Sequence, residues 1–418
     1  MKNILLLSAV ASAMLMAGGD IAPSPVEETA PAPAEFLIFS NIQAHGEIRG
    51  RYEDVATDEV PATTKDAYAY SARMQLALQA DLFQVEGLSV FLEATGVFTD
   101  GDYWGGPNST MPNGYDAIVD PNQSRFTQMY IDYKFGDTLL RAGRQDVDLD
   151  NQRFIGTVDW RQMPQTYDAV AVVNNSIENL NLMAAYVWQV NQVFQRSNFD
   201  TESILLHASY KFIPELTLTG YGYLLEDIHD TWGIAATGKA DAGFAKIGYR
   251  AEYAIQQDAS MGRSNADAAY YNLAVNANMN GFLLGAGYEV LSGSNGTDNK
   301  TNFTTPLATL HAHNGWADVF LLGGGSPGEG LVDITGMIGY NAGEYGLFKA
   351  IYHDFTADVG GDDYGTEWDL LYKNKIPSVK GLTGLLKAAF YTADNGTTAW
   401  APANSDKTVL WAQLDYKF

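Results

Sequence analysis

The chain has 418 residues, a formal net charge of −25 and no cysteine. The lack of cysteine excludes disulfides, thiol nucleophiles and cysteine-ligated zinc, and the excess of acid over base argues against a nucleic-acid partner. After the first residues no stretch of about 18 apolar residues occurs, so the sequence predicts no helical membrane span.

The N-terminus has the layout of a secretory signal peptide. Lys2 precedes an apolar run from Ile4 to Met16, and small residues follow at Ala17-Gly18-Gly19. The run is too short to cross a bilayer as a helix. We therefore predict a signal peptide over residues 1–19, whose cleavage site stays open. Residues 20–40, rich in proline, alanine and glutamate, are predicted to form a flexible periplasmic segment.

From residue 41 to Phe418 the chain consists of short runs in which apolar residues alternate with polar or small ones. In the run Arg125–Phe135, Thr127 and Met129 fall on the apolar face, whereas Phe126 and Gln128 fall on the other. In a transmembrane barrel one face of each strand contacts lipid and the other faces the lumen. The alternation therefore predicts an outer-membrane β-barrel over residues 41–418.

Turn signals separate the runs and are of two kinds. Counting the runs gives about 18 strands, and a barrel of that size encloses an aqueous channel. We expect short turns on the periplasmic side and long loops outside the cell, in an all-β, antiparallel transmembrane barrel. The short turns include Val85-Glu86-Gly87, Gly136-Asp137, Ile213-Pro214-Glu215 and Asn280-Gly281, and the long connections lie near 54–66, 101–123, 146–165, 293–330 and 394–405.

The last run, Thr408–Phe418, ends the chain on an aromatic residue preceded by alternating apolar residues. This ending resembles the C-terminal signature of outer-membrane barrels. The resemblance implies that the barrel-assembly machinery is a partner and that Phe418 belongs to the recognised signal. Outer-membrane lipids and lipopolysaccharide are the other expected partners of the outward face.

The stretch Leu139–Ala169 is the most distinctive part of the sequence, and it resembles the alginate export porin family. A second, shorter match includes His313-Asn314-Gly315 with Asp318, then Gly330-Leu331 and Asp333. The residues that carry the first match are Gly143-Arg144-Gln145, Asp150-Asn151-Gln152-Arg153-Phe154-Ile155-Gly156, Trp160-Arg161-Gln162 and Thr166-Tyr167-Asp168-Ala169.

The resemblance implies a barrel whose lumen guides an anionic polysaccharide with arginines, here Arg141, Arg144, Arg153 and Arg161. A guanidinium stays charged and grips a carboxylate with two hydrogen bonds. Strand parity alone points Arg144 outward, which favours a structural role for it. Parity independently directs a set of cations toward the lumen: Arg49, Arg51, Arg73, Arg141, Arg250, Lys246 and Lys387.

The same parity directs carboxylates into the lumen, and these offer a structural alternative in which each arginine is neutralised. The carboxylates are Glu47, Asp81, Glu93, Asp132, Glu252 and Glu289. Further acid falls in predicted outer loops, for example at Glu53-Asp54 and Asp362-Asp363. An acidic vestibule repels polyanions at low salt, which weakens alginate as the solute.

The predicted function is therefore a porin that passes small or oligomeric polar or charged solutes without catalysis, cofactor or bound metal. His311 and His313 form the only close histidine pair, and no third metal ligand is evident from the sequence. A plugged surface barrel (adhesin, receptor or membrane-embedded hydrolase) is the alternative, because 146–165 and 293–330 are long enough to fill a lumen.

Overall fold

The computed structural model describes residues 37–58, 65–101, 103, 115–194, 198–262, 266–296, 300–321, 324–394, 398 and 400–418. The chain divides into residues 1–37 and a compact unit, Ile38–Phe418. The predicted signal peptide and the predicted periplasmic segment as far as residue 36 lie outside the described residues. The first strand begins at Phe39, close to the predicted start of the barrel at residue 41.

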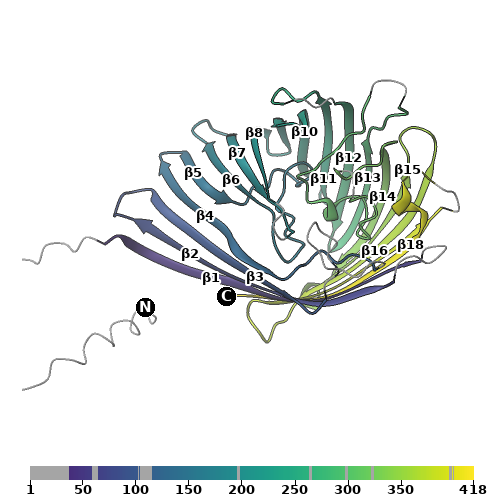
Figure 1. Cartoon of the computed structure of the whole chain (residues 1–418), viewed down its shortest axis with the longest axis horizontal. Coiled ribbons are helices and arrows are strands. Elements are labelled where there is room, and N and C mark those ends of the chain that lie inside the picture. Colours follow the sequence, from purple (N-terminus) through teal and green to yellow (C-terminus); the bar gives the residue numbers. More distant parts are fainter. Residues whose placement is uncertain are drawn as a thin grey trace, which may run out of the picture. The chain divides into compact units, whose positions relative to one another are not determined.

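The compact unit is an antiparallel sheet of 18 strands with almost no helix (Figure 1). The strands are β1 (Phe39–Asp58), β2 (Ala67–Leu82), β3 (Leu88–Thr99), β4 (Gln123–Phe135), β5 (Thr138–Gln145), β6 (Thr166–Asn174), β7 (Leu180–Asn191), β8 (Asn198–Ile213), β9 (Leu216–Leu225), β10 (His229–Asp241), β11 (Lys246–Gln257), β12 (Asp267–Met279), β13 (Phe282–Leu291), β14 (Leu331–Asn341), β15 (Leu347–Thr356), β16 (Asp363–Lys375), β17 (Leu382–Ala393) and β18 (Asp406–Lys417). The short 3₁₀ helices with described bounds are η1 (Leu310–Ala312), η3 (Gly343–Tyr345) and η4 (Ala401–Asn404). Each strand pairs with its neighbours in sequence, and β1 also pairs with β18, so the sheet closes. The predicted fold class and strand number are confirmed.

Within the described residues, none of the helices has the length and apolar character needed to cross a bilayer.

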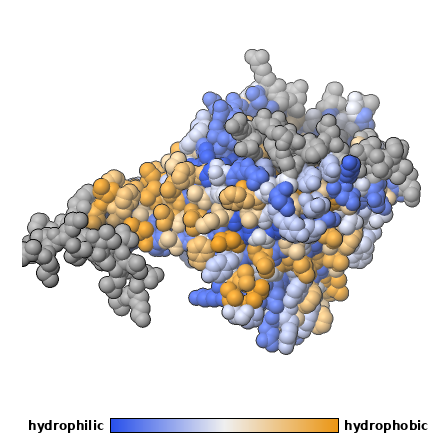
Figure 2. Space-filling view, turned by 60° about the horizontal axis from the view of Figure 1, so that its bottom comes forward, coloured by the Kyte–Doolittle hydropathy of each residue, from blue (hydrophilic) through white to orange (hydrophobic). Residues whose placement is uncertain are grey.

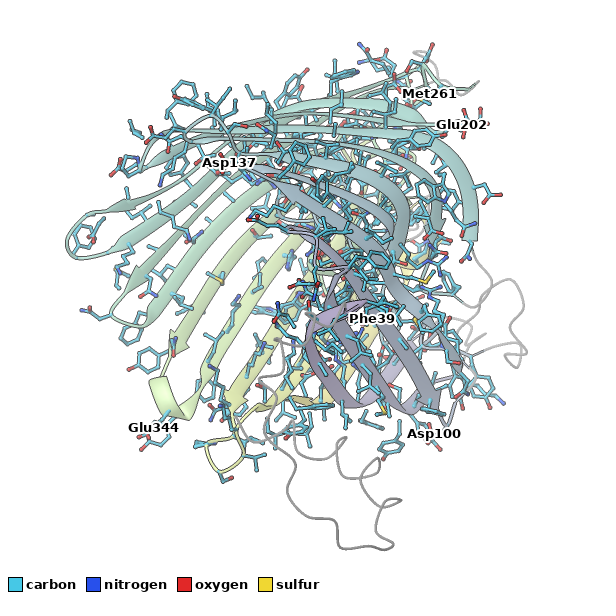
Figure 3. All side chains as sticks on the ribbon, turned by 90° about the vertical axis from the view of Figure 1, so that its left-hand side faces the viewer. Phe39, Asp100, Asp137, Glu202, Met261 and Glu344 are labelled. Carbon is cyan, nitrogen blue, oxygen red and sulfur yellow. The ribbon has the colours of Figure 1, made fainter. Side chains whose placement is uncertain are left out.

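The connections divide the barrel into a short-turn end and a long-loop end. Figure 3 shows Asp137 and Glu344 of the short turns on the left and Asp100, Glu202 and Met261 toward the right. In outer-membrane barrels the short turns lie on the periplasmic side. The short turns are 83–87, 136–137, 175–179, 214–215, 242–245, 280–281, 342–346 and 376–381, and the largest connections at the other end are 100–122, 146–165 and 292–330.

Side chains alternate between an apolar outer surface and a polar interior. On β2, Met74, Leu76 and Leu78 are about half exposed, whereas Arg73 and Ala77 are buried. A band of hydrophobic residues crosses the visible face of the barrel, with hydrophilic residues above it (Figure 2). So much exposed apolar surface is unfavourable in water, and it matches the lipid-facing belt of a transmembrane barrel.

A β-bulge corrects the predicted faces of β4. The β3–β4 register shifts between Glu93 and Ala94, so the partner of Glu93 is Gln128 and that of Ala94 is Phe126. The extra residue, Thr127, is fully buried and Phe126 is half exposed. Placing Thr127 on the lipid-facing side was wrong, because a bulge shifts the alternation by one residue.

The first strand is longer than predicted, which moves an acidic residue from a loop into the lumen. β1 continues to Asp58 and pairs with β18 over that whole stretch. Glu53 therefore lies on the inward face, and it is 2% exposed. The prediction that Glu53 belongs to an outer loop was wrong, because two neighbouring strands extend the pairing beyond the last clear apolar alternation.

Candidate pore constriction

Two long connections fold into the barrel and bind each other. We call residues 146–165 the first inner loop and residues 300–321 the second inner loop. Ile155 and Leu307 form a parallel bridge, and the amide of Gly156 donates to the carbonyl of Leu307 at 2.9 Å. The amide of Thr309 donates to the carbonyl of Gln152 at 3.0 Å. The constriction is therefore one unit made of two segments that are distant in sequence.

Two arginines of the first inner loop bind it to its surroundings. Arg153 is fully buried and donates to Glu289 on β13 at 3.0 Å and to Asn314 at 2.9 Å. Arg161 donates to Glu53 on β1 at 2.9 Å and to Asp318 of the second inner loop at 3.0 Å. Removing one partner of such a buried pair costs about 3–5 kcal/mol, since the remaining charge is left uncompensated.

The surroundings of Arg153 and Asp318 favour the charged form of each side chain. Burial opposes the charge on Arg153, but Glu289 and Tyr270 outweigh it, and the pKa of Arg153 is raised. Burial likewise raises the pKa of Asp318, but its contacts with His311 and Arg161 outweigh this and lower it to about 2. Arg153 of the first inner loop and Asp318 of the second are thus both charged at neutral pH.

The arginines of β1 and β2 point inward and bind the same loop. Arg73 donates to Asp159 at 2.6 Å and also contacts Glu47. Arg49 donates to the carbonyl of Asp159 at 2.9 Å and to Asp415 on β18 at 2.8 Å. These guanidinium groups are at most 8% exposed, whereas the carboxylate of Asp159 remains 55% exposed.

Arg51 and Lys387 enclose an aromatic cluster between the inner loops and the wall. The Arg51 guanidinium lies 4.1 Å from the Trp160 ring centre. Lys387 on β17 lies 4.2 Å from the Trp160 ring and 3.7 Å from the Trp316 ring, and its ammonium group donates to His311 Nε2 at 2.6 Å. Burial lowers the pKa of His311 to about 3. The neutral imidazole can therefore accept from Lys387 while its Nδ1–H donates to Asp318 at 2.8 Å.

The second inner loop is also bound to the wall by two carboxylates on β16. The amide of Ala317 donates to Glu367 at 2.8 Å, and that of Trp316 donates to Asp369 at 3.2 Å. Both carboxylates are fully buried. The sequence prediction missed Glu367 and Asp369, although an acid–x–acid pair on the inward face of a strand is a usable signal.

The opposite side of the first inner loop packs into an aromatic cluster. The Phe154 ring lies 5.3 Å from the rings of Tyr221 and Tyr270 and 5.9 Å from that of Phe303. Tyr167 donates to the carbonyl of Gly156 at 2.9 Å. These side chains anchor the loop to β6, β9 and β12.

Gly156 permits the close approach of the two inner loops. A Cβ atom there would lie 2.4 Å from Thr309 Oγ1 and 2.8 Å from the Gln152 side chain. The preceding turn has positive φ angles at Asp150 and Gln152, and Asn151 is exposed in it. Asp150 lies 3.2 Å from His207 on β8.

The remaining predicted lumen cations differ from the buried set. Arg141 donates twice to Asp132 at 2.8 Å and stacks 3.8 Å from the Tyr130 ring centre, with 26% of its side chain exposed. Arg250 pairs with Glu252 at 2.8 Å. Lys246 is exposed at the short-turn end of β11, and no ion pair to it exists among the described residues.

The other motif residues organise the wall. Arg144 pairs with Asp168 at 2.7 Å on the outward face, opposite the lipid-facing Met129. Gly143, at φ 129°, lies so close to β4 that a Cβ would sit 2.3 Å from the Met129 carbonyl oxygen. Gln145 is buried and donates to the carbonyl of Ala169 at 3.1 Å. The backbone of Phe418 exchanges hydrogen bonds with Gly46, which secures the end of β18.

Known proteins resemble this chain in one segment of the sequence and in the fold. A sequence model of the alginate export family matches residues 108–201, which include the first inner loop. No curated protein matches the sequence. The fold is similar to solved structures of OpdL from Pseudomonas aeruginosa (17% identity, TM-score 0.67, covering 90% of this chain and 99% of that one), of P. aeruginosa OpdK with vanillate (14%, 0.66, 90% and 98%) and of OccAB4 from Acinetobacter baumannii (14%, 0.66, 91% and 98%).

A closed barrel of 18 strands, an apolar outer belt and these likenesses together define an outer-membrane porin-like barrel. At identities of 14–17%, these structural likenesses show that the fold is shared.

Proposed function

We propose that this protein is a passive outer-membrane channel for polar or charged solutes, with no catalytic step. The observation that carries the proposal is the interior of the barrel. Its strands direct charged and polar side chains inward, and two inner loops narrow the lumen while their arginine pairs hold them against the wall. A barrel of 16 to 18 strands normally leaves an aqueous channel.

Within this function, the arginines act mainly on the shape of the constriction. Arg51, Arg73, Arg153 and Arg161 are buried against carboxylates, carbonyl oxygens or aromatic rings. Arg141, Arg250 and Lys246 keep exposure and are the predicted lumen cations that we propose contact solute. The match over residues 108–201 supports a relation to alginate export porins through the first inner loop.

The partners that we propose for the channel are those that its outward face can contact. We propose that outer-membrane lipids and lipopolysaccharide surround the apolar belt, and that the barrel-assembly machinery recognises β18 with its exposed terminal Phe418. These partners follow from the lipid-facing alternation and from the residue type at the chain end.

The direct test is conductance of the purified, refolded barrel in a planar lipid bilayer. Discrete single-channel steps are expected, together with swelling of liposomes in small sugars but not in long oligosaccharides. A barrel that is folded, as judged by its heat-sensitive migration in gels, yet never conducts would overturn the proposal.

A plugged barrel is the second candidate, and one observation favours it. The inner loops bury their own aromatic core around Phe154 and Phe303, as a permanent plug would. A plugged receptor or adhesin would show neither conductance nor swelling in any sugar, so the same two measurements separate the candidates.

A further inference from the structure

Three carboxylates of the constriction have no ion pair among the described residues. Asp146 and Asp148 are exposed residues of the first inner loop, and Glu93 on β3 faces them. Gln128 binds both Asp146, at 2.9 Å, and Glu93, at 3.5 Å, so it places these two carboxylates side by side. Among the described residues, none of the three carboxylates has a cation within 4 Å.

The cations of the same region are already engaged. Arg49 and Arg73 bind the Asp159 segment, Arg141 binds Asp132, and Arg161 binds Glu53 and Asp318. A bidentate pair such as Arg141–Asp132 has little net field beyond its immediate surroundings. The field that a passing ion experiences in the constriction is therefore dominated by the exposed carboxylates that have no ion pair, Asp146 and Asp148, together with Glu93.

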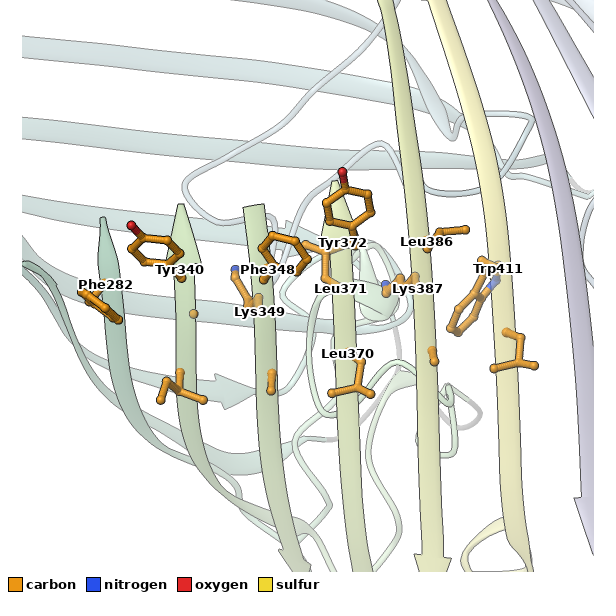
Figure 4. Close-up of a pocket in the computed structure, with 15 residues that line it drawn as sticks. Phe282, Tyr340, Phe348, Lys349, Leu370, Leu371, Tyr372, Leu386, Lys387 and Trp411 are labelled. Carbon is orange, nitrogen blue, oxygen red and sulfur yellow. The ribbon is translucent and has the colours of Figure 1, made fainter. Parts of the chain in front are cut away.

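The short-turn half of the lumen has the opposite charge. Seven inward-facing lysines near the short-turn end have no ion pair with any described residue, and we call them the lysine belt. Figure 4 shows one of them, Lys349, next to Phe348 on β15. Asp81 and Asp241 face inward at the same end and offset only part of the charge on the inward face, while further acids such as Asp137, Glu178 and Glu344 lie in the short turns themselves. The belt consists of Lys134, Lys211, Lys239, Lys246, Lys349, Lys373 and Lys375.

We propose that Asp146, Asp148 and Glu93 make the constriction selective for cations and for solutes that carry an ammonium group, and that the lysine belt makes conduction asymmetric. This inference rests on the proposed channel function. It assigns the specificity-determining groups to carboxylates, whereas the buried arginines Arg73, Arg153 and Arg161 hold the inner loops.

The narrow part of the lumen decides selectivity because charges act there at short range. Screening reduces a charge's effect beyond about 8 Å at physiological salt, so the belt acts weakly on ions in the centre of the wider mouth. A constriction lined by one sign of charge focuses its field and raises the local concentration of counter-ions. The negative constriction and the positive lysine belt lie one after the other along the lumen. The ion concentration inside the lumen then depends on the sign of the applied voltage, so the current differs between the two directions.

The test is the reversal potential of single channels in a KCl gradient at pH 9, where the Asp146 carboxyl is ionised. The unaltered barrel should prefer K⁺ over Cl⁻, and the isosteric triple variant D146N/D148N/E93Q should lower that permeability ratio by about threefold or more. The single variant D146N should lower it by a smaller factor, which gives a second measure if the triple variant folds poorly. A matched control neutralises three exposed acids of the short turns, D137N/E178Q/E344Q, and should leave the ratio unchanged.

Rectification tests the lysine belt separately. Replacing Lys134, Lys373 and Lys375 by methionine should make the current–voltage curve more symmetric while the channel still prefers cations. Chloride preference in the unaltered barrel, or a ratio that D146N/D148N/E93Q leaves unchanged, would overturn this inference and leave the channel function standing. A folded barrel with no conductance would overturn the channel function and this inference with it.

Discussion

The two halves of the lumen differ in which cations they present and in what those cations contact. In the long-loop half, cations are buried and paired, as Arg153 is with Glu289 and Arg161 with Glu53. In the short-turn half, lysines such as Lys239 and Lys373 are exposed and unpaired among the described residues. Arginine suits the first task because its planar group satisfies several acceptors at once, and lysine suits the second because it is readily hydrated.

The comparison teaches that the position of a cation on the inward face does not indicate what it contacts. Arg73 and Lys246 both point into the lumen, yet Arg73 is 1% exposed and Lys246 is exposed. The difference arises from the inner loops, which cover one half of the wall and leave the other half to water.

The largest expected effect comes from breaking the buried arginine pairs. Replacing Arg153 and Arg161 by alanine should release the first inner loop, because Glu289 and Glu53 would be left buried without a partner, at about 3–5 kcal/mol each. Single-channel conductance should rise by about twofold or more, with noisier open states. R144A removes a pair on the outward face and serves as the control, with unchanged conductance; an equal increase there would contradict the assignment.

The next effect concerns the aromatic cluster around Lys387. K387M keeps the length of the side chain but removes the charge that lies over the Trp160 and Trp316 rings. Cation–π contacts of this kind contribute about 1–2 kcal/mol when desolvated. The second inner loop should become more mobile, which increases quenching of tryptophan fluorescence by acrylamide. K246M, at the exposed lysine belt, should leave quenching as it is.

A pH dependence should sharpen the contrast between the halves. Enclosure in the barrel, followed by the negative charges of Glu93, Asp148 and Asp159, raises the pKa of Asp146 to about 8, which Arg141 only partly offsets. Asp146 is then neutral well below pH 8 and charged above it. The preference for cations should rise from pH 6 to pH 9, as reversal potentials will show. D146N should flatten this rise, and a rise that survives in D146N would assign it to another group.

The smallest effect is expected where the inner loops meet. G156A places a Cβ atom against Thr309 and Gln152, and such overpacking typically costs about 1–3 kcal/mol. Thermal unfolding should shift downward by a few degrees, with conductance changed by less than about twofold. G136A, in a short turn with space around it but a positive φ, tests whether backbone strain alone produces the same shift without any change in conductance.

The sequence could predict the barrel because lipid on one face and water on the other require apolar and polar side chains to alternate along every strand. That rule assigns successive residues to alternate faces of a strand. It failed at Thr127, where a bulge adds one residue without a compositional signal. It also failed at Glu53, since the length of β1 depends on pairing with β18 at the far end of the chain.

The constriction was less accessible to prediction because its contacts join segments far apart in the sequence. Arg153 and its partner Glu289 are separated by 136 residues, and Arg161 and Asp318 by 157. Parity could direct Lys387 inward, but only the folded loops bring Trp160 and Trp316 to it. Asp146 and Asp148 stand beside the recognised motif, and their exposure depends on how the loop turns inside the barrel.

The most direct test of a constriction formed by fixed inner loops uses the absence of cysteine from the chain. Ile155 and Leu307 are bridge partners, so the double variant I155C/L307C brings two sulfur atoms within reach of a disulfide. Single-channel conductance should be the same in oxidised and reduced protein, because solute passes beside loops that stay joined. Loss of conductance on oxidation, with recovery on reduction, would contradict the account, since the loops would then have to separate for the channel to open.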